Sequence, residues 1–308
     1  MSLSQRHLDK STLPIMQDAK RKIDQIICVC CARDAIVWKI ASMYITKNID
    51  SVHYKVIVPD NEVELFKKIS SKPFEILGES VYTKRFASEI KKRLSNKISG
   101  QFGWYLQQFI KLSAVAGCKA HEIVLIWDAD TVPLKKLVFI DEQGRLNYYR
   151  GTEHHQPYFE TIERLLHLSK KVNFSFIAQC FAIKAEWIQE LFDDIEKKYD
   201  QSWELALLDA INFEEGNSFS EYETLGTFVS EHHASEINYI QSEWLRLGNS
   251  TIGHPAFLSP HIISKKLNQY DFVSFEKWDK AKPYFWKVSL PFFLKVYLPA
   301  FFKPNTNT

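Results

Sequence analysis

Hydrophobic and polar positions follow two alternating patterns over the first half of the chain. Short apolar runs bounded by turn residues predict buried strands at 23–30, 52–58, 74–77 and 123–127. Apolar residues spaced three or four apart predict the helices between them, at 35–48, 62–70 and 103–116. Strands that alternate with helices predict an α/β fold with a mainly parallel sheet flanked by helices.

The second half is less regular. Its pattern predicts a strand, two helices and a loop that continues as a helix, at 174–183, 186–199, 203–211 and 218–229. We therefore expect a polar lead-in, a main domain and an aromatic, basic C-terminal segment, over residues 1–22, 23–260 and 261–308. Within the main domain, a regular half over about 23–140 precedes an irregular half over about 141–260.

Composition and charge exclude several classes of protein. The 308 residues are 45% hydrophobic and 25% charged, as in ordinary globular proteins. A balance of 39 Lys and Arg against 37 Asp and Glu is too even for an electrostatic nucleic-acid binder, so we expect no nucleic-acid partner. The basic stretch Lys84–Lys97 favours a solvated helix face, with a phosphate or acidic-lipid contact as the alternative.

Cysteine spacing and hydropathy bear on the compartment. The five cysteines, at 28, 30, 31, 118 and 180, are odd in number and lack the paired knuckles of zinc sites. The first 24 residues carry no apolar signal core, and no apolar run reaches the length of about 20 residues that spans a bilayer. We expect a reduced, cytoplasmic protein.

Two carboxylates, Asp128 and Asp130, directly follow the most apolar predicted strand, Ile123–Trp127. Ligands of open α/β sheets bind at the carboxyl ends of the strands, and hard carboxylate oxygens suit Mg²⁺ or Mn²⁺, which bridge phosphate oxygens. The alternative is a turn in which an Asp caps the next segment.

Three segments together resemble a known family. A Gly-Trp-Tyr-x-Gln-Gln helix at 103–108, an Asp-x-Asp-Thr strand end at 128–131 and Phe-Ser-Glu-Tyr-Glu at 219–223 look like those of GT-A glycosyltransferases. More narrowly, they are similar to a bacterial group assigned as glycosyltransferases and largely of unknown function. The resemblance covers roughly residues 24–260. It implies a GT-A-like, Rossmann-like fold in which 23–140 binds the nucleotide and 141–260 the acceptor.

The resemblance also implies roles for individual residues around a bound metal. Asp130 would ligate Mn²⁺ or Mg²⁺ on the diphosphate of a sugar nucleotide, and Asp128 would bind the metal or the donor ribose. His254, in a Gly-His-Pro segment, is the candidate third ligand, with an ordinary loop histidine as the alternative.

Further residues would bind the nucleotide-sugar donor. Cys30, Ala32 and Arg33 would line the nucleotide pocket, and Asp60 could accept hydrogen bonds from the base or the ribose. The amides of Gln107 and Gln108 would bond donor hydroxyls or orient Asp128.

An inverting transferase also needs a carboxylate that takes the acceptor's proton. Glu221 and Glu223 are the candidates, while Ser220 followed by Glu223 is equally a helix capping box. A retaining enzyme would need no such base. Gln179 is a weaker polar candidate on the acceptor side.

The predicted function is hexosyl transfer from a nucleoside-diphosphate sugar to a glycan or lipid-linked acceptor, in bacterial surface polysaccharide synthesis. Aromatic residues interleaved with lysines over 278–303 suit a membrane surface, or else pack on the domain. The main alternative is a phosphatase of the haloacid dehalogenase type, with Asp128 as nucleophile and Asp130 as acid and base. That motif normally opens its domain, whereas about 100 structured residues precede it here. A non-catalytic sugar-binding protein of the same fold is a third hypothesis.

Overall fold

The computed structural model describes residues 22–94 and 101–280. Nearly all of the predicted lead-in, and residues 281–303 of the predicted membrane-surface segment, lie outside these ranges. No helix within them is long and apolar enough to cross a membrane.

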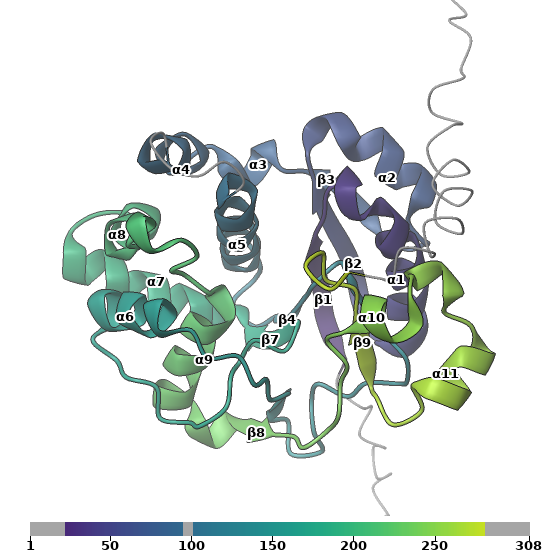
Figure 1. Ribbon diagram of the computed structural model, residues 1–308. Helices are drawn as coiled ribbons and strands as arrows, with labels where there is room; N and C mark the ends of the chain where they lie inside the picture. Colours follow the sequence, from purple (N-terminus) through teal and green to yellow (C-terminus); the bar gives the residue numbers. More distant parts are fainter. Residues whose placement is uncertain (1–21, 95–100, 281–308) are drawn as a thin grey trace, which may run out of the picture.

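A five-stranded sheet lies at the centre, in the order β3-β2-β1-β4-β7 (Figure 1). Strands β1 to β4 run parallel, and β7 pairs antiparallel with β4. Their bounds are β1 (Ile23–Val29), β2 (Ser51–Val58), β3 (Glu75–Gly78), β4 (Ile123–Trp127) and β7 (Cys180–Lys184). The expected α/β fold with a mainly parallel sheet is confirmed.

Helices cover both faces of this sheet. In Figure 1, α1 and α2 lie on one side, and α5, α7 and α8 lie on the other. The α-helices are α1 (Ala35–Asn48), α2 (Val63–Ile69), α3 (Ser80–Thr83), α4 (Ala87–Leu94), α5 (Gln101–Ala116), α6 (Gln156–Leu166), α7 (Ala185–Tyr199), α8 (Trp203–Ala210), α9 (Glu221–His232), α10 (Gly248–Ile252) and α11 (Pro260–Lys266). Five short 3-10 helices are η1 (Ala32–Asp34), η2 (Asp60–Glu62), η3 (Phe213–Glu215), η4 (Ala234–Glu236) and η5 (Pro255–Phe257).

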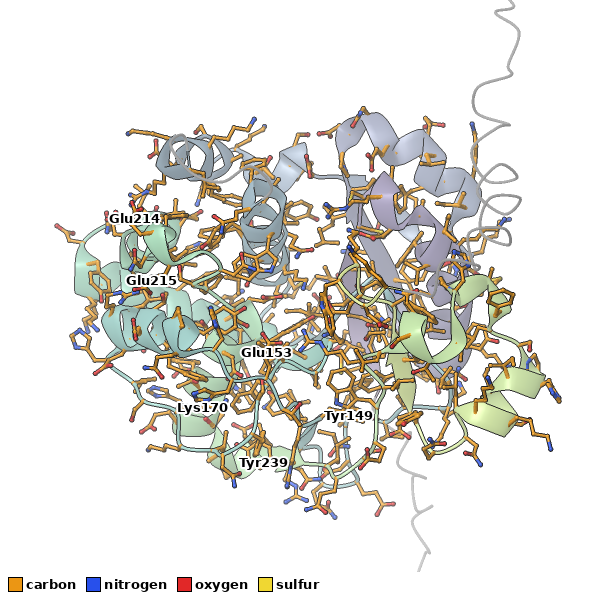
Figure 2. The ribbon with its side chains drawn as sticks, in the orientation of Figure 1. Tyr149, Glu153, Lys170, Glu214, Glu215 and Tyr239 are labelled. Atoms are coloured by element: carbon orange, nitrogen blue, oxygen red, sulfur yellow. The ribbon has the colours of Figure 1, made fainter. Side chains whose placement is uncertain are left out.

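Burial explains why β4 could be predicted from the sequence. A parallel strand covered on both faces needs apolar side chains at every position, and all five residues of β4 are buried. The last of them, Trp127, meets the rings of Phe139 and Phe272 edge-on. Side chains fill the space between ribbons throughout the molecule (Figure 2). The strand therefore fixes where the residues after it, from Asp128 onward, emerge.

Two small sheets connect distant parts of the chain. Strand β5 (Thr131–Pro133) pairs antiparallel with β9 (Phe272–Ser274), and β6 (Leu146–Tyr148) pairs with β8 (Ile237–Tyr239). Strand β7, from the irregular half, belongs to the main sheet. Strand pairings therefore cross the boundaries expected near 140 and 260.

The strand predicted over 174–183 is only partly present, because β7 begins at Cys180. Gln179 has a left-handed backbone, with φ of 61°, and this conformation turns the chain just before β7. Its carbonyl accepts a hydrogen bond from the backbone N–H of Asp128 at 2.9 Å. The turn links the start of β7 to the end of β4. Upstream of it, Phe176 is buried in the core.

Gly226 of α9 should not tolerate a methyl group, because an added Cβ would overlap the ring of Phe176. Gly226→Ala should lower the free energy of unfolding by about 1–3 kcal/mol, despite alanine's better helix propensity. Gly103→Ala, in α5, is the matched control, since nothing lies within 4 Å of its added Cβ. The Gly103→Ala variant should gain about 0.5–1 kcal/mol in the free energy of unfolding. Chemical denaturation compares the two, and equal effects would contradict the packing described.

Candidate functional site

A cleft opens at the carboxyl ends of β1 and β4. In the strand order β3-β2-β1-β4, the sheet changes direction between these two strands, and this switch point is where open α/β sheets bind ligands. Val29 ends β1 and lines the cleft, as do Asp128, Ala129 and Asp130 after β4. The cleft holds about 780 Å³ of empty space, part of it open to solvent.

The helix α5 forms one wall through a single face. Trp104, Gln107, Gln108 and Lys111 all line the cleft, at the three- and four-residue spacing of one helical stripe. The N-terminal turn of α9 forms the adjoining wall with Ser220, Glu221 and Tyr222. These residues are mainly polar or charged, whereas other α5 side chains, such as Leu106, Phe109 and Ile110, pack into the core.

Negative charge dominates the lining. Six carboxylates line the cleft against two cationic side chains: Asp34, Asp128, Asp130, Glu153, Glu221 and Glu276 against Lys111 and Arg246. Lys277, beside the cleft, offsets one of them by pairing with Asp34 at 2.9 Å. Carboxylates removed from water in such numbers destabilise a protein unless cations accompany them.

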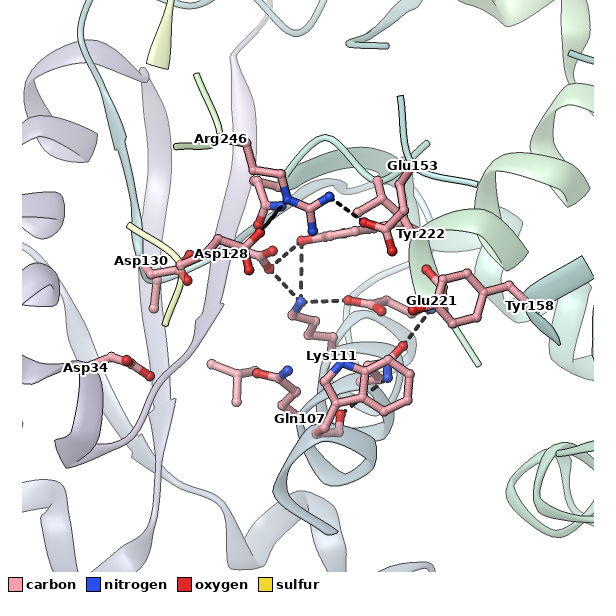
Figure 3. Close-up of a pocket in the computed structure, with 18 residues that line it drawn as sticks. Asp34, Gln107, Lys111, Asp128, Asp130, Glu153, Tyr158, Glu221, Tyr222 and Arg246 are labelled. Atoms are coloured by element: carbon pink, nitrogen blue, oxygen red, sulfur yellow. Dashed lines mark hydrogen bonds and ion pairs between the residues drawn. The ribbon is translucent and has the colours of Figure 1, made fainter. Parts of the chain in front are cut away.

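The ammonium of Lys111 is buried between two of these carboxylates (Figure 3). Its Nζ lies 2.6 Å from Oδ1 of Asp128 and 2.6 Å from Oε1 of Glu221. The hydroxyl of Tyr222 also donates to Oδ1 of Asp128, at 2.7 Å. Burial disfavours the ammonium, but the two carboxylates outweigh it and raise the pKa of Lys111. Lys111 is therefore charged, and it ties α5 to β4 and α9.

Side chains at the start of α9 point in different directions. Glu221 faces Lys111, and burial raises the pKa of its carboxyl although Lys111 opposes the shift. The Oε1 of Gln108 accepts from the backbone N–H of Glu221 at 2.9 Å. Ser220 caps the helix by accepting from the backbone N–H of Glu223 at 3.3 Å. The side chain of Glu223 instead lies in the core, paired with Lys170 at 2.9 Å.

Asp130 is the least compensated carboxylate of the cleft. Burial, together with Asp128, Glu276 and Asp34, raises its pKa to about 8, and Lys277 only partly opposes this. Among the described residues, its carboxyl takes part in one side-chain hydrogen bond, from Thr131 at 3.3 Å. Asp130 therefore sits in a field that favours either a proton or a bound cation.

Arg246 closes the opposite side of the cleft. Its guanidinium pairs with Glu153 and, at 2.7 Å, with Glu276. Glu276 also accepts from Nε2 of Gln179 at 3.1 Å and from the indole of Trp278 at 2.8 Å. These bonds connect the segment after β9 to the residues around Asp128.

Five of the residues expected from the sequence meet in this cleft: Asp128, Asp130, Gln107, Gln108 and Glu221. The side chain of Gln108 bonds to the backbone of Trp104 and of Glu221, so it orients the start of α9. In the described residues Asp128 is held by Lys111 and Tyr222 instead. Gln179, the weaker candidate, lines the cleft as well.

Four expected nucleotide-binding residues do not line the cleft: Cys30, Ala32, Arg33 and Asp60. The thiol of Cys30 is buried, and burial raises its pKa. The N–H of Ala32 donates to Glu62, and Arg33 is exposed. Asp60 accepts from the hydroxyl of Ser80 at 2.8 Å, so it supports the start of α3.

His254 and Glu223 also lie apart from the cleft lining. The Nδ1 of His254 accepts from the backbone N–H of Ala256 at 3.1 Å and caps η5. Buried Glu223 also accepts from the hydroxyl of Ser175 at 2.5 Å. Its side chain therefore lies in the core, and only the Ser220 half of the expected capping box is seen in the described residues. Within residues 22–94 and 101–280, no three His, Cys, Asp or Glu side chains form a ready metal site.

The sequence did not single out five charged residues of the cleft: Asp34, Lys111, Glu153, Arg246 and Glu276. Lys111 left a signal, because it follows Gln107 by four residues and stands in an otherwise apolar stretch. Arg246 and Glu276 left no signal in the sequence, because pairing between distant strand segments brings them to the site.

A family model matches most of the chain. The model of DUF6492, described as a family of unknown function, matches residues 20–284. The chain belongs to this family. DUF6492 carries no activity in its description, and no curated protein matches the sequence.

Solved structures similar to this DUF6492 chain include three glycosyltransferases. Mouse xyloside xylosyltransferase 1 is 8% identical with a TM-score of 0.44, over 84% of this chain and 99% of that chain. Galactosyltransferase LgtC, solved with donor and acceptor sugar analogues, is 9% identical with a TM-score of 0.39, over 82% and 86%. GlyE of Streptococcus pneumoniae TIGR4 is 10% identical with a TM-score of 0.40, over 91% and 63%. Likenesses this distant transfer no activity or residue role to the DUF6492 chain.

Lys111→Met should destabilise the protein strongly, because it leaves Asp128 and Glu221 without their shared counter-charge. We expect a loss of about 3–5 kcal/mol in the free energy of unfolding. Adding Glu221→Gln to this variant removes one uncompensated charge and should restore part of the loss. Urea denaturation measures all three proteins. A Lys111→Met variant as stable as the original chain would show that the network is not needed for folding.

Asp130→Asn should do the reverse and stabilise the protein in the absence of divalent cations. The folded-state pKa of about 8 lies above the ordinary value of 3.8, so the folded state loses stability as pH rises from about 4 to 8. The variant escapes this loss, with a gain of up to about 4 kcal/mol at pH 7 that vanishes near pH 4.

Asp141→Asn is the matched control for the pH profile. Slight burial of Asp141 is outweighed by hydrogen bonds from Arg145, which lower the pKa of the Asp141 carboxyl. Its stabilising effect is present at neutral pH and is lost in acid, so this variant should be less stable than the original chain at pH 7. Denaturation in EDTA between pH 4 and 9 tests both variants. Parallel profiles would exclude the proposed charge field around Asp130.

Proposed function

We propose that this chain is a metal-dependent glycosyltransferase that moves a sugar from a nucleoside-diphosphate sugar to a glycan or lipid-linked acceptor. The observation that carries the proposal is the excess of carboxylates around Asp130, at the switch point of an α/β sheet. A cation and a diphosphate together satisfy such a site, because the cation binds carboxylates on one side and phosphate oxygens on the other. The three sequence segments that resemble GT-A glycosyltransferases all contribute to this cleft.

The residues present fit a hard divalent cation. Mg²⁺ typically keeps several waters and is held by one or two carboxylates plus substrate phosphates. Asp130 would supply one carboxylate and Asp128 a second, through Oδ2, since Lys111 and Tyr222 occupy Oδ1. A site completed by the diphosphate would explain why no full ligand set is preassembled among the described residues. The structure does not place His254 with these two carboxylates.

The chain's own residues would position the reactants. Lys111 holds Asp128 in place, and Gln107 has an amide at the cleft that could bond donor hydroxyls. The bound cation would stabilise the negative charge that grows on the leaving diphosphate. If the reaction inverts configuration, Glu221 would receive the acceptor's proton, and its raised pKa suits that role.

Several finer expectations stay predictions. These are the hexosyl class, the link to bacterial surface polysaccharide, and a cytoplasmic place at the inner face of the membrane.

For the haloacid-dehalogenase-type phosphatase, Asp128 would have to attack phosphorus. The strand before it is the fourth of the chain, whereas the motif of that class normally opens its domain. The described residues therefore give that alternative no particular support.

Calorimetric titration with a panel of nucleoside diphosphates tests the proposal. One nucleotide should bind in Mn²⁺ and lose at least about tenfold in affinity in EDTA, because a cation-bridged contact is removed. Asp130→Asn should weaken the Mn²⁺-dependent binding by a similar factor.

Asp141→Asn, which changes a carboxylate far from the cleft lining, should bind like the original chain. Equal nucleotide affinity in Mn²⁺ and EDTA would exclude metal dependence. Absence of binding by a folded protein would remove the donor site altogether. Hydrolysis of p-nitrophenyl phosphate by the original chain, lost in Asp128→Asn, would support the phosphatase instead.

A further inference from the structure

A second cavity adjoins the cleft. It holds about 1080 Å³ of empty space, part of it open to solvent, and its wall includes Arg150 and the segment from Ile240 to Trp244. Ile177 and Arg246 line both this second cavity and the cleft. A molecule bound in the second cavity would therefore lie directly beside one bound in the cleft.

The two arginines of the second cavity differ in their partners. Arg246 pairs with two glutamates. Arg150 makes no ion pair with any residue in the described parts of the chain, although its guanidinium is half-buried over the ring of Phe174, 5.1 Å from its centre. Its Nη2 reaches only the carbonyl of Tyr239, at 3.5 Å, and its Nε has no hydrogen-bond partner there. Tyr239 is labelled in Figure 2.

A half-buried guanidinium without a counter-charge is unfavourable for the free protein. Its donors are pre-arranged for a carboxylate or a phosphate, which guanidinium groups bind through paired hydrogen bonds. The attraction is stronger here than at a fully exposed site, because the surrounding protein screens the charge less than water does. Arg150 therefore marks the second cavity as a place for an anionic group.

The rest of the wall suits a carbohydrate. Trp244 is held by stacking on Phe272 and by a hydrogen bond from its indole to the carbonyl of Arg150 at 3.0 Å. Its rigid ring offers an apolar surface beside a polar rim. The exposed side chain of Gln241 on that rim can bond hydroxyl groups.

We propose that the second cavity binds the acceptor, and that this acceptor carries an anionic group, a carboxylate or a phosphate, beside Arg150. That the bound molecule is the acceptor rests on the proposed function. That it carries a negative charge rests on the guanidinium of Arg150, which is unpaired among the described residues. Among the same residues, Glu243 is the one carboxylate that lines this cavity, and its negative charge opposes the anion. The two residues thus predict substitution effects of opposite sign.

Binding of small sugars to the full chain tests this. Glucuronic acid supplies a carboxylate, glucose 6-phosphate supplies a phosphate, and glucose is the neutral reference. Ligand-observed NMR at fixed ionic strength should give at least one anionic sugar a Kd about tenfold lower than that of glucose. Which of the two is preferred identifies the anion. Arg150→Gln should abolish the preference and leave the Kd of glucose unchanged.

Two further variants test the proposal even if Arg150→Gln folds poorly. Glu243→Gln removes a like charge at an exposed position, so it should tighten binding of the anionic sugar about twofold to threefold without affecting glucose. Lys265→Gln removes a positive charge on exposed α11 and should change nothing. The proposal is wrong if neither anionic sugar binds better than glucose, or if Arg150→Gln retains the preference. It is also wrong if Glu243→Gln has no effect.

The result can be separated from the fate of the proposed function. The cleft is reported by Mn²⁺-dependent binding of a nucleoside diphosphate that Asp130→Asn weakens and Arg150→Gln leaves unchanged. Nucleotide binding without a preference for anionic sugars would overturn the inference alone. An Arg150-dependent preference without nucleotide binding would support the anion site and remove the transferase.

Discussion

The buried ammonium of Lys111 is the contact on which the cleft depends. It holds Asp128, at the end of the central strand, and Glu221, at the first turn of α9, within hydrogen-bonding distance of one nitrogen atom. Each carboxylate alone would be unfavourable there, and the lysine alone would be as well. The three charges are stable only as a set, so three separate elements must pack at a fixed spacing. The geometry of the remaining lining follows from that spacing.

The same network determines which carboxylate of the cleft has no ion-pair partner among the described residues. Lys111 forms ion pairs with Asp128 and Glu221, and Arg246 forms ion pairs with Glu153 and Glu276. Within the described chain, Asp130 forms no ion pair. A protein optimised for stability alone would place an amide at this position. Retention of a carboxylate with a pKa near 8 is the pattern expected where folding stability has been exchanged for binding.

Local patterns predicted much of the fold and part of the site. The helix over 35–48 and the strand over 123–127 have the predicted bounds, because their apolar periods reflect burial against adjacent elements. Asp128 and Asp130 could be identified because they follow such a strand. Glu223 could not be separated from Glu221, since only the helical turn of α9 sends one into the core and the other to the cleft. Arg246 and Glu276 depend on strand pairings between distant residues, for which a single sequence holds no signal.

The pairing of β9 with β5 has a consequence for biosynthesis. Glu276 and Lys277 reach the cleft only after β9 has docked beside the residues that follow Asp130. During translation, strands β1 to β7 are complete before Glu276 and Lys277 have been synthesised. Until then, Asp34 lacks its ion pair with Lys277, and Arg246 lacks its ion pair with Glu276. A chain whose synthesis has not yet passed β9 would therefore lack this wall of the cleft.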